Sequence, residues 1–337
     1  ITKTTLAKYF NTRLVIHEEA LAEVTAFFRS RGRELTELNR LQAALPENCT
    51  FVSNTMGTAP GMWFEQKGKV FVSMPGVPYE MKGLMTNRIL AMLQQHFRTP
   101  IIHHKIIRTV GIGESVLAEK IEYWEDNLPA HIKLAYLPNL SQVKLRLTAT
   151  GENRSRLEEQ VQQEIDRVMP LIAPYVYGYD DEDLEKAVGQ LLLRHQLTLA
   201  AAESCSGGYL AHLVTRVPGS SRYFRGAVVP YSNDLKTQLL GVKEDTLTRF
   251  GAVSEQTARE MAERVREKLG TSLGVSSTGV AGPSGGTEEK PVGTVWIACA
   301  DGHRTEARKL QLSQFRELNI QLTAVHVLNL LRTFVND

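Results

Sequence analysis

The chain has 337 residues, 42% of them hydrophobic, a length that predicts two or three domains with sizeable buried cores. Its 39 lysines and arginines nearly cancel its 37 aspartates and glutamates, so the formal net charge of +2 favours neither a nucleic acid nor a membrane surface as a partner. The three cysteines lack paired spacing and no apolar run reaches transmembrane length, which argues against a disulfide framework, a zinc site and a membrane span and favours a reducing, cytoplasmic setting.

Residues 1–98 predict the later part of an α/β domain. The stretches "LVIHEEALAEVTAFFRSRG" and "ELTELNRLQAAL" have helical periodicity, and an extended stretch then turns as a hairpin at Lys67 and Gly68. A helix from about residue 78 to 97 closes this part. Two or three strands are few for such a domain. The first residues, "ITKTTLAKYF", are typical of the interior of a helix that has no N-terminal cap. We therefore expect the start of the domain to be missing.

Residues 99–178 predict a compact βαββα module of about eighty residues, a common size for a small domain. A strand, "IIHHKIIRTV", is followed by a helix that opens at "GIGES", by two strands and by a charged helix. The "GIGE" spacing is that of the loop that clamps nucleotides in KH domains, but no basic cluster adjoins it, which argues against nucleic acid. The acidic stretch "YGYDDEDLE" is expected to join this module to the next domain.

Residues 179–337 predict a third domain, in which short apolar strands alternate with helices. This alternation is typical of a mostly parallel α/β sandwich with helices on both faces of the sheet. Ligands bind such sheets beyond the carboxyl ends of the strands. The segments "ESCSGG", "YSNDLK" and "SSTGVAGPSGG" stand at such ends, and "SQFRE" stands before the last helix, which makes this edge the candidate site.

The segment "ESCSGG" offers Ser204 as a candidate nucleophile. Free N–H groups at the following helix start, around Ser206, Gly207 and Gly208, would hold an anion or a developing oxyanion. The alternative is structural, with the serines capping the helix and Cys205 filling the core. A serine hydroxyl needs a base, and the histidines nearest in sequence fall within helical segments rather than at strand ends.

The segment "YSNDLK" supplies a candidate base, because a desolvated lysine can stay neutral and accept a proton. Lys236 is that lysine, with Tyr231 beside it. The alternative for Lys236, taken alone, is a solvated residue on a helix.

The segment "SSTGVAGPSGG" places Thr278 at a strand tip and then a glycine-rich loop that turns backbone N–H groups toward a ligand. It matches neither common nucleotide fingerprint, and a flexible tight loop is the alternative. Arg316, in "SQFRE", suits a phosphate. The loop glycines that we single out are Gly279, Gly282 and Gly285.

These segments together resemble the CinA family, also called competence/damage-inducible protein A, over essentially the whole chain. The segments "AESCSGG", "GAVVPYSNDLK", "SSTGVAGPSGG" and "KPVGTVWIA" resemble its C-terminal amidase domain in order. The segments "NTMGTAPGMWFE" and "MPGVPYEM" resemble its N-terminal domain of the molybdopterin-binding MoaB/MogA type, and residues 99–178 resemble its KH-like linker domain.

The resemblance implies that the C-terminal domain deamidates nicotinamide mononucleotide to nicotinate mononucleotide and ammonia, in pyridine-nucleotide recycling and without a cofactor. By motif, Ser204 is the nucleophile, Lys236 the base, and Tyr231 and Thr278 support them; the glycine-rich loop and Arg316 contact the nucleotide phosphate. The family also implies a homodimer and, in a complete N-terminal domain, a divalent metal for hydrolysis of ADP-ribose.

Two departures from the family pattern stand out. The "GGLGPT" segment and paired aspartates that usually precede this chain's first residues are not in it, so no pyrophosphatase site is assigned. The family often has a second arginine shortly after the position of Arg316, whereas this chain has "NIQ", Asn319 to Gln321. We therefore expect weaker anchoring of the phosphate.

Two alternative functions remain open at this stage. One is a metal-dependent ADP-ribose pyrophosphatase in the N-terminal domain, with a C-terminal domain that only binds nucleotide. The other is a nonenzymatic adaptor in competence or DNA damage.

Overall fold

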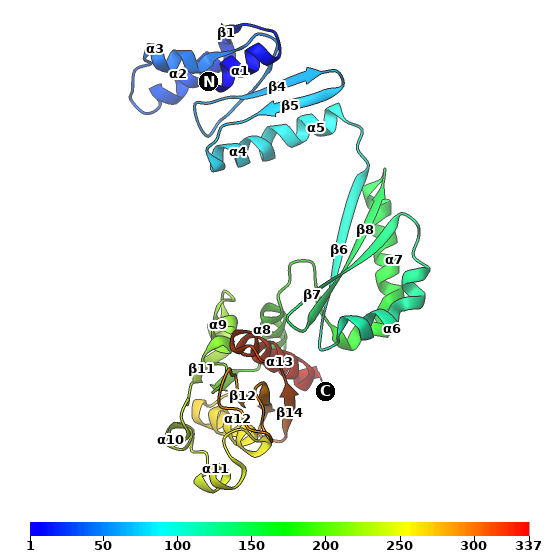
Figure 1. Ribbon diagram of the computed structural model, residues 1–337, viewed down its shortest axis with the longest axis vertical. Coiled ribbons are helices and arrows are strands. Elements are labelled where there is room, and N and C mark those ends of the chain that lie inside the picture. Colours follow the sequence, from blue (N-terminus) through cyan, green and yellow to red (C-terminus); the bar gives the residue numbers. More distant parts are fainter. Residues whose placement is uncertain (337) are drawn as a thin grey trace. The chain divides into compact units, whose positions relative to one another are not determined.

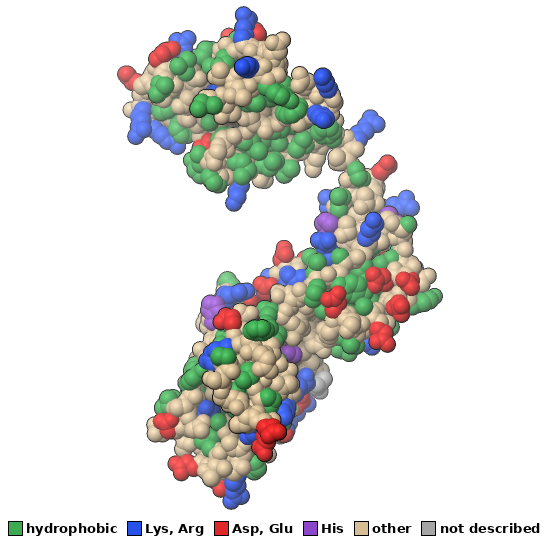
Figure 2. Space-filling view, in the orientation of Figure 1, with side chains coloured by type: hydrophobic (Ala, Val, Ile, Leu, Met, Phe, Trp, Pro, Cys, Tyr) green, Lys and Arg blue, Asp and Glu red, His purple; other side chains and the backbone are tan. Residues whose placement is uncertain are grey.

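The structure, a computed structural model, describes residues 1–336 and falls into two compact units, Ile1–Pro100 and a second unit that begins at Ile101 (Figure 1). The mixed α/β class predicted from the sequence is confirmed. In the described residues no helix has both the length and the apolar character needed to cross a membrane. Acidic and basic side chains are interspersed over the visible faces of both units, in keeping with the small net charge (Figure 2).

The first unit contains two small antiparallel sheets, β1-β2 and β3-β4-β5. The predicted hairpin is present, and its turn residues Lys67 and Gly68 both have positive φ, as a tight two-residue turn requires. The predicted closing helix is interrupted by a π-helical segment, Met85–Ile89. The elements are α1 Thr2–Tyr9, β1 Leu14–Ile16, α2 Glu18–Arg29, α3 Glu37–Arg40, β2 Ala44–Pro46, β3 Thr50–Val52, β4 Gly61–Gln66, β5 Lys69–Ser73, α4 Pro78–Leu84 and α5 Leu90–His96.

The second unit begins with an antiparallel sheet of order β7-β8-β6-β9, packed against two helices. Strand β8 alternates buried and exposed residues, and its buried side chains, such as Leu145 and Leu147, join the core formed with the helices. The predicted βαββα order is extended by β9, which arises from the stretch taken as a joint. The elements are β6 Ile101–Val110, α6 Glu114–Asp126, β7 Ile132–Asn139, β8 Gln142–Gly151, α7 Arg154–Ile172 and β9 Val176–Tyr179.

The remainder of the second unit is built on a five-stranded sheet of order β11-β10-β12-β13-β14. Strands β11, β10 and β12 are parallel, whereas β13 and β14 are added antiparallel. The sheet is therefore mixed, and its parallel part carries the candidate site. The elements are α8 Leu184–Arg194, β10 Leu199–Glu203, α9 Tyr209–Thr215, β11 Phe224–Val228, α10 Asn233–Leu235, α11 Glu244–Phe250, α12 Glu255–Leu269, β12 Leu273–Gly279, β13 Thr294–Ala300, β14 Thr305–Gln311 and α13 Arg316–Asn336.

Helices cover both faces of this sheet, as predicted (Figure 1). Helices α8, α9 and α13 pack on one face, where Ala201, Val275 and Ile297 contribute to the largest core. Helix α12 packs on the other face against Ala200 and Ala202 of β10. The small side chains of β10 allow this close approach, which holds the end of the strand, and hence the candidate site, in a fixed place.

The close contact of α12 with β12 predicts a sharp effect for Gly274→Ala. A Cβ at Gly274 would lie 2.1 Å from the Ala262 carbonyl oxygen and 2.7 Å from Arg266 Cβ, so the helix must shift. Overpacking of this kind costs about 1–3 kcal/mol, and the melting temperature should fall in calorimetry. Gly113→Ala is the control, because its Cβ meets no atom within 4 Å. Equal melting temperatures for the two variants would contradict the packing described.

Candidate active site

The structure brings the predicted nucleophile and base together. Ser204 follows the last residue of β10, and Lys236 begins a π-helical turn after α10. The Lys236 Nζ atom lies 3.2 Å from Ser204 Oγ and donates a hydrogen bond to it. Ser204 is 8% exposed and Lys236 only 2%. A lysine that the sequence alone could not distinguish from a solvated one is therefore a buried partner of the serine.

The surroundings of Lys236 favour its neutral form. Burial lowers the pKa of the Lys236 ammonium, and the charges of Cys205 and Asp234 oppose that shift only in part. Besides Ser204, Nζ donates to the Pro230 carbonyl oxygen at 3.2 Å. Within residues 1–336 no carboxylate forms an ion pair with Lys236. A buried amine with these partners is suited to accept a proton from Ser204.

The turn after Ser204 differs from the anion-binding site that the sequence predicts. Gly208 N–H donates to the Glu203 carboxylate at 3.1 Å, and Gly207 N–H donates to the Ser204 carbonyl at 3.1 Å. The Ser206 hydroxyl donates to Glu203 at 2.8 Å. The cap of α9 is thus Glu203, and the N–H groups of Gly207 and Gly208 are already used. Among the described residues no oxygen accepts from the N–H groups of Cys205 and Ser206.

Cys205 lies in the core, as expected of a filler residue. It is 6% exposed, and burial raises the pKa of its thiol to about 12. A thiol with so high a pKa is a poor nucleophile at neutral pH. Of the three side chains that follow Glu203, Ser204 is the one paired with Lys236, whereas the Ser206 hydroxyl donates to the Glu203 carboxylate.

Thr278 does not contact the serine–lysine pair. Its hydroxyl donates to the Ala252 carbonyl at 2.7 Å, and the side chain is 1% exposed. Successive residues of a strand point to opposite faces of the sheet. Ser277 therefore faces Ser206, with 2.7 Å between their hydroxyl oxygens, while Thr278 faces the segment before α12. The expected direct support by Thr278 is not seen in the structure.

Arg316 and Tyr231 meet, although 85 residues separate them. The Arg316 guanidinium donates to the Tyr231 hydroxyl at 2.5 Å and to the Gly282 carbonyl at 2.9 Å. Tyr231 is 56% exposed. The pair stands at the surface beside the strand ends, where Arg316 keeps further N–H donors for a ligand. Tyr231 contacts Arg316 rather than Ser204 or Lys236.

The glycine-rich loop is fixed to the start of α13. Asn319 is 1% exposed, and its amide donates to the carbonyls of Ala281 and Ser313 at 2.9 Å each. In the sequence, Asn319 stood out only because it lies where the family has a second arginine. Nothing in the motif predicted that Asn319 holds the glycine-rich loop. It holds the loop through hydrogen bonds that a longer arginine could not reproduce unchanged.

The three loop glycines have different roles. A Cβ on Gly279 would lie 2.7 Å from the Thr294 carbonyl oxygen, so this glycine serves the packing of β12 against β13. Gly282 has a φ of +89°, and a Cβ there would lie 2.5 Å from Val292. Gly285 has a φ of +86°, and a Cβ there would lie 4.0 Å from the Val280 side chain. Of the three, Gly285 is the least crowded.

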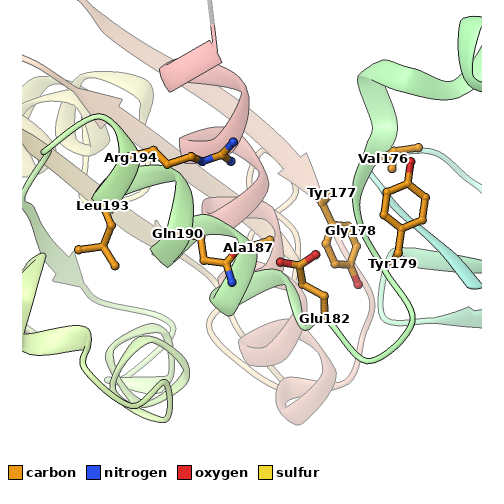
Figure 3. Close-up of a pocket in the computed structure, with 9 residues that line it drawn as sticks. All are labelled: Val176, Tyr177, Gly178, Tyr179, Glu182, Ala187, Gln190, Leu193 and Arg194. Carbon is orange, nitrogen blue, oxygen red and sulfur yellow. The ribbon is translucent and has the colours of Figure 1, made fainter.

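The hollow between β9 and α8 is separate from this site. It has a volume of about 590 Å³, and Figure 3 shows side chains such as Tyr177, Glu182 and Gln190 around it. Neither Ser204 nor Lys236 lines it. In the part of the chain that the structure describes, no group of three or more His, Cys, Asp or Glu side chains could hold a metal ion.

The fold and the site define a protein with a buried Ser/Lys pair on an α/β domain, next to a KH-like module. The family model for the CinA C-terminal domain matches residues 181–335, and that for the damage-inducible protein CinA KH domain matches residues 104–178.

Relatives match over nearly the whole chain. A CinA-like protein of Cytophaga hutchinsonii is 52% identical over 332 residues, covering 98% of this chain and 79% of that protein. A putative competence-damage inducible protein of Acetivibrio thermocellus is 40% identical over 339 residues, covering 99% and 81%. The crystal structure of competence/damage inducible protein CihA from Agrobacterium tumefaciens shares 35% identity, covers 46% of this chain and 94% of that chain, and has a TM-score of 0.45. The chain belongs to the CinA family.

The burial of Lys236 predicts that Lys236→Met stabilises the folded protein at neutral pH. Because burial lowers the pKa of Lys236, the unfolded chain holds this proton more tightly than the folded chain does. Wild-type stability should therefore rise with pH between the folded-state pKa and the ordinary value of 10.5. Lys236→Met should gain about 1 kcal/mol or more at pH 7, because folding of the variant no longer desolvates an amine that is protonated in the unfolded chain. Denaturant titrations at pH 7 and pH 10 measure this gain, and a less stable variant at pH 7 would contradict the assignment.

Proposed function

We propose that the C-terminal domain is a serine amidohydrolase that converts nicotinamide mononucleotide to nicotinate mononucleotide and ammonia. The observation that carries the proposal is the 3.2 Å contact between Lys236 Nζ and Ser204 Oγ in a buried setting. The substrate follows from the resemblance of the motifs to the family's amidase domain. In this proposal the domain occupies residues 179–337, follows a KH-like linker of residues 99–178 and a MoaB/MogA-like part of residues 1–98, and acts in cytoplasmic pyridine-nucleotide recycling.

The proposed reaction has two stages. Neutral Lys236 takes the Ser204 proton as Ser204 Oγ bonds to the carboxamide carbon, which gives a tetrahedral oxyanion. The carbon–nitrogen bond then breaks, and the Lys236 ammonium gives its proton to the departing nitrogen, which leaves as ammonia. Water next attacks the acyl-serine while Lys236 takes its proton. Breakage of the ester returns the Lys236 proton to Ser204 and releases the carboxylic acid, which gives its own proton to solvent.

The N–H groups of Cys205 and Ser206 are the proposed oxyanion donors. They are free of acceptors in the described chain, whereas the N–H of Gly207, expected from the sequence, is already used. A donor of this kind contributes about 3–4 kcal/mol to the transition state. This choice keeps the oxyanion next to the nucleophile without a metal ion.

The proposed phosphate anchor is Arg316. Two of its N–H groups are taken by Gly282 and Tyr231, and those bonds hold the guanidinium in place. Its remaining donors can meet a phosphate oxygen. The proposed homodimer and an ADP-ribose activity of the N-terminal part rest on the family resemblance alone.

Removing either member of the pair tests the reaction. Ser204→Ala and Lys236→Ala should each lower ammonia release from nicotinamide mononucleotide by at least about 10³-fold, because each removes the nucleophile or its base. Ser272→Ala and Lys268→Ala are the matched controls, since Ser272 precedes β12 at the end opposite Thr278 and Lys268 lies in the last turn of α12. The assay couples ammonia to glutamate dehydrogenase, with no metal added. Wild-type turnover in either site variant would overturn the assignment.

Removing the phosphate anchor should change binding more than chemistry. Arg316→Ala is expected to raise KM for the mononucleotide by about 10-fold or more, since a charge-assisted hydrogen bond is worth roughly 1.5–3 kcal/mol. Nicotinamide riboside, which lacks the phosphate, should be affected much less. Equal losses for both substrates would place the phosphate elsewhere.

A further inference from the structure

A buried carboxylate lies directly before the nucleophile. Glu203 is the last residue of β10 and is 0% exposed. Its Oε2 atom accepts hydrogen bonds from Ser206 Oγ at 2.8 Å, Gly208 N at 3.1 Å and Leu210 N at 3.0 Å. Its Oε1 atom accepts one from Ala211 N at 2.8 Å. Four donors thus converge on one side chain.

These donors replace a counter-ion. In the described residues no lysine, arginine or histidine forms an ion pair with Glu203. Burying a polar group is costly unless it is hydrogen-bonded, and four hydrogen bonds meet the two oxygens of Glu203. Because the four donors approach from different parts of the turn, the carboxylate can occupy only one position.

The same bonds fix the residues around Ser204. The Ser206 hydroxyl lies between Glu203 and Ser277, 2.7 Å from the Ser277 hydroxyl oxygen. Ser204 N–H donates to the Ser277 carbonyl at 2.9 Å. The turn that carries the nucleophile is therefore tied to β12 as well as to β10. Its remaining N–H groups without an acceptor are those of Cys205 and Ser206.

We propose that Glu203 is a positioning residue for the deamidation, a role that rests on the proposed function. By binding the first N–H groups of α9 and the Ser206 hydroxyl, it keeps the Cys205 and Ser206 N–H groups free for the oxyanion and holds Ser204 Oγ at Lys236. The hydrogen bonds of Glu203 go to Ser206, Gly208, Leu210 and Ala211, so it acts through the turn.

The test compares Glu203→Gln with Glu185→Gln in the full chain. Glutamine keeps the size of the side chain but turns an NH₂ group toward N–H donors. Glu185 is a second buried carboxylate of the same domain, 9% exposed and paired with Arg216 at 2.7 Å, away from the turn. We expect Glu203→Gln to lower kcat about 100-fold with KM within threefold of wild type, and Glu185→Gln to leave both near wild type.

A second readout does not depend on the substrate. Phenylmethanesulfonyl fluoride sulfonylates a serine: Oγ bonds to sulfur, fluoride leaves, and Lys236 takes the proton. The labelling rate of Ser204, followed by intact mass, should fall in Glu203→Gln as kcat does. Failure of the wild-type chain to release ammonia would refute the proposed substrate, while the labelling rate would still test Glu203.

Two further variants separate positioning from folding. Glu203→Asp should recover part of the labelling rate, and Ser206→Ala, which removes one donor of four, should lose about 10-fold or less. The fraction of folded protein is measured for each by calorimetry. The proposal would be overturned if folded Glu203→Gln were labelled at the wild-type rate. If Glu203→Gln does not fold, the wild-type rate in both Glu203→Asp and Ser206→Ala would overturn it.

Discussion

The proposed reaction depends on a buried lysine that forms no ion pair with a carboxylate of residues 1–336. In that part of the chain the hydrogen-bond partners of Lys236 Nζ are the Ser204 hydroxyl and the Pro230 carbonyl, and burial lowers the pKa of Lys236. A protein that needed only stability would place an apolar side chain here, because an unpaired buried ammonium is costly. The same cost makes the amine a base at a pH where an exposed lysine would be protonated. In the proposed reaction, the energy lost in burying Lys236 is what activates Ser204.

The surrounding fold meets the demands of this pair. Strand β10 consists of small residues up to Glu203, so α12 packs closely on one face and α9 and α13 on the other. Glu203 fixes the turn on one side of Ser204, and Asn319 fixes the glycine-rich loop on the other. Arg316 is then held at the mouth of the site by the carbonyl of Gly282 and the hydroxyl of Tyr231.

Much of this arrangement could be predicted from the sequence. Hydrophobic alternation gave the α/β class and the covered sheet, and the strand-end position of Ser204 and Lys236 predicted that they would meet. Strand β14 was missed because charged residues interrupt it and none of its side chains is buried, so it has no apolar run. Strand β9, Val176–Tyr179, was missed because it is short and runs directly into the acidic residues that begin at Asp180.

The hydrogen-bond partners within the site could not be predicted from the sequence. A glycine pair at the start of a helix predicts N–H groups that are free to bind an anion. In the structure the carboxylate of Glu203, from the preceding strand, accepts hydrogen bonds from these N–H groups. The motif favoured Thr278 as the supporting residue, but the structure places the Ser277 hydroxyl at the turn and the Thr278 hydroxyl at the Ala252 carbonyl. Side-chain competition for the same N–H groups depends on three-dimensional placement, which periodicity does not encode.

The most direct measurement of the central claim is rapid-quench mass spectrometry of the enzyme during turnover of nicotinamide mononucleotide. If Ser204, activated by Lys236, attacks the carboxamide, the peptide that contains Ser204 should carry the nicotinate mononucleotide acyl group within the first turnover, and added hydroxylamine should convert that group to the hydroxamate. Release of ammonia with the peptide unmodified, and with no hydroxamate formed, would contradict the account.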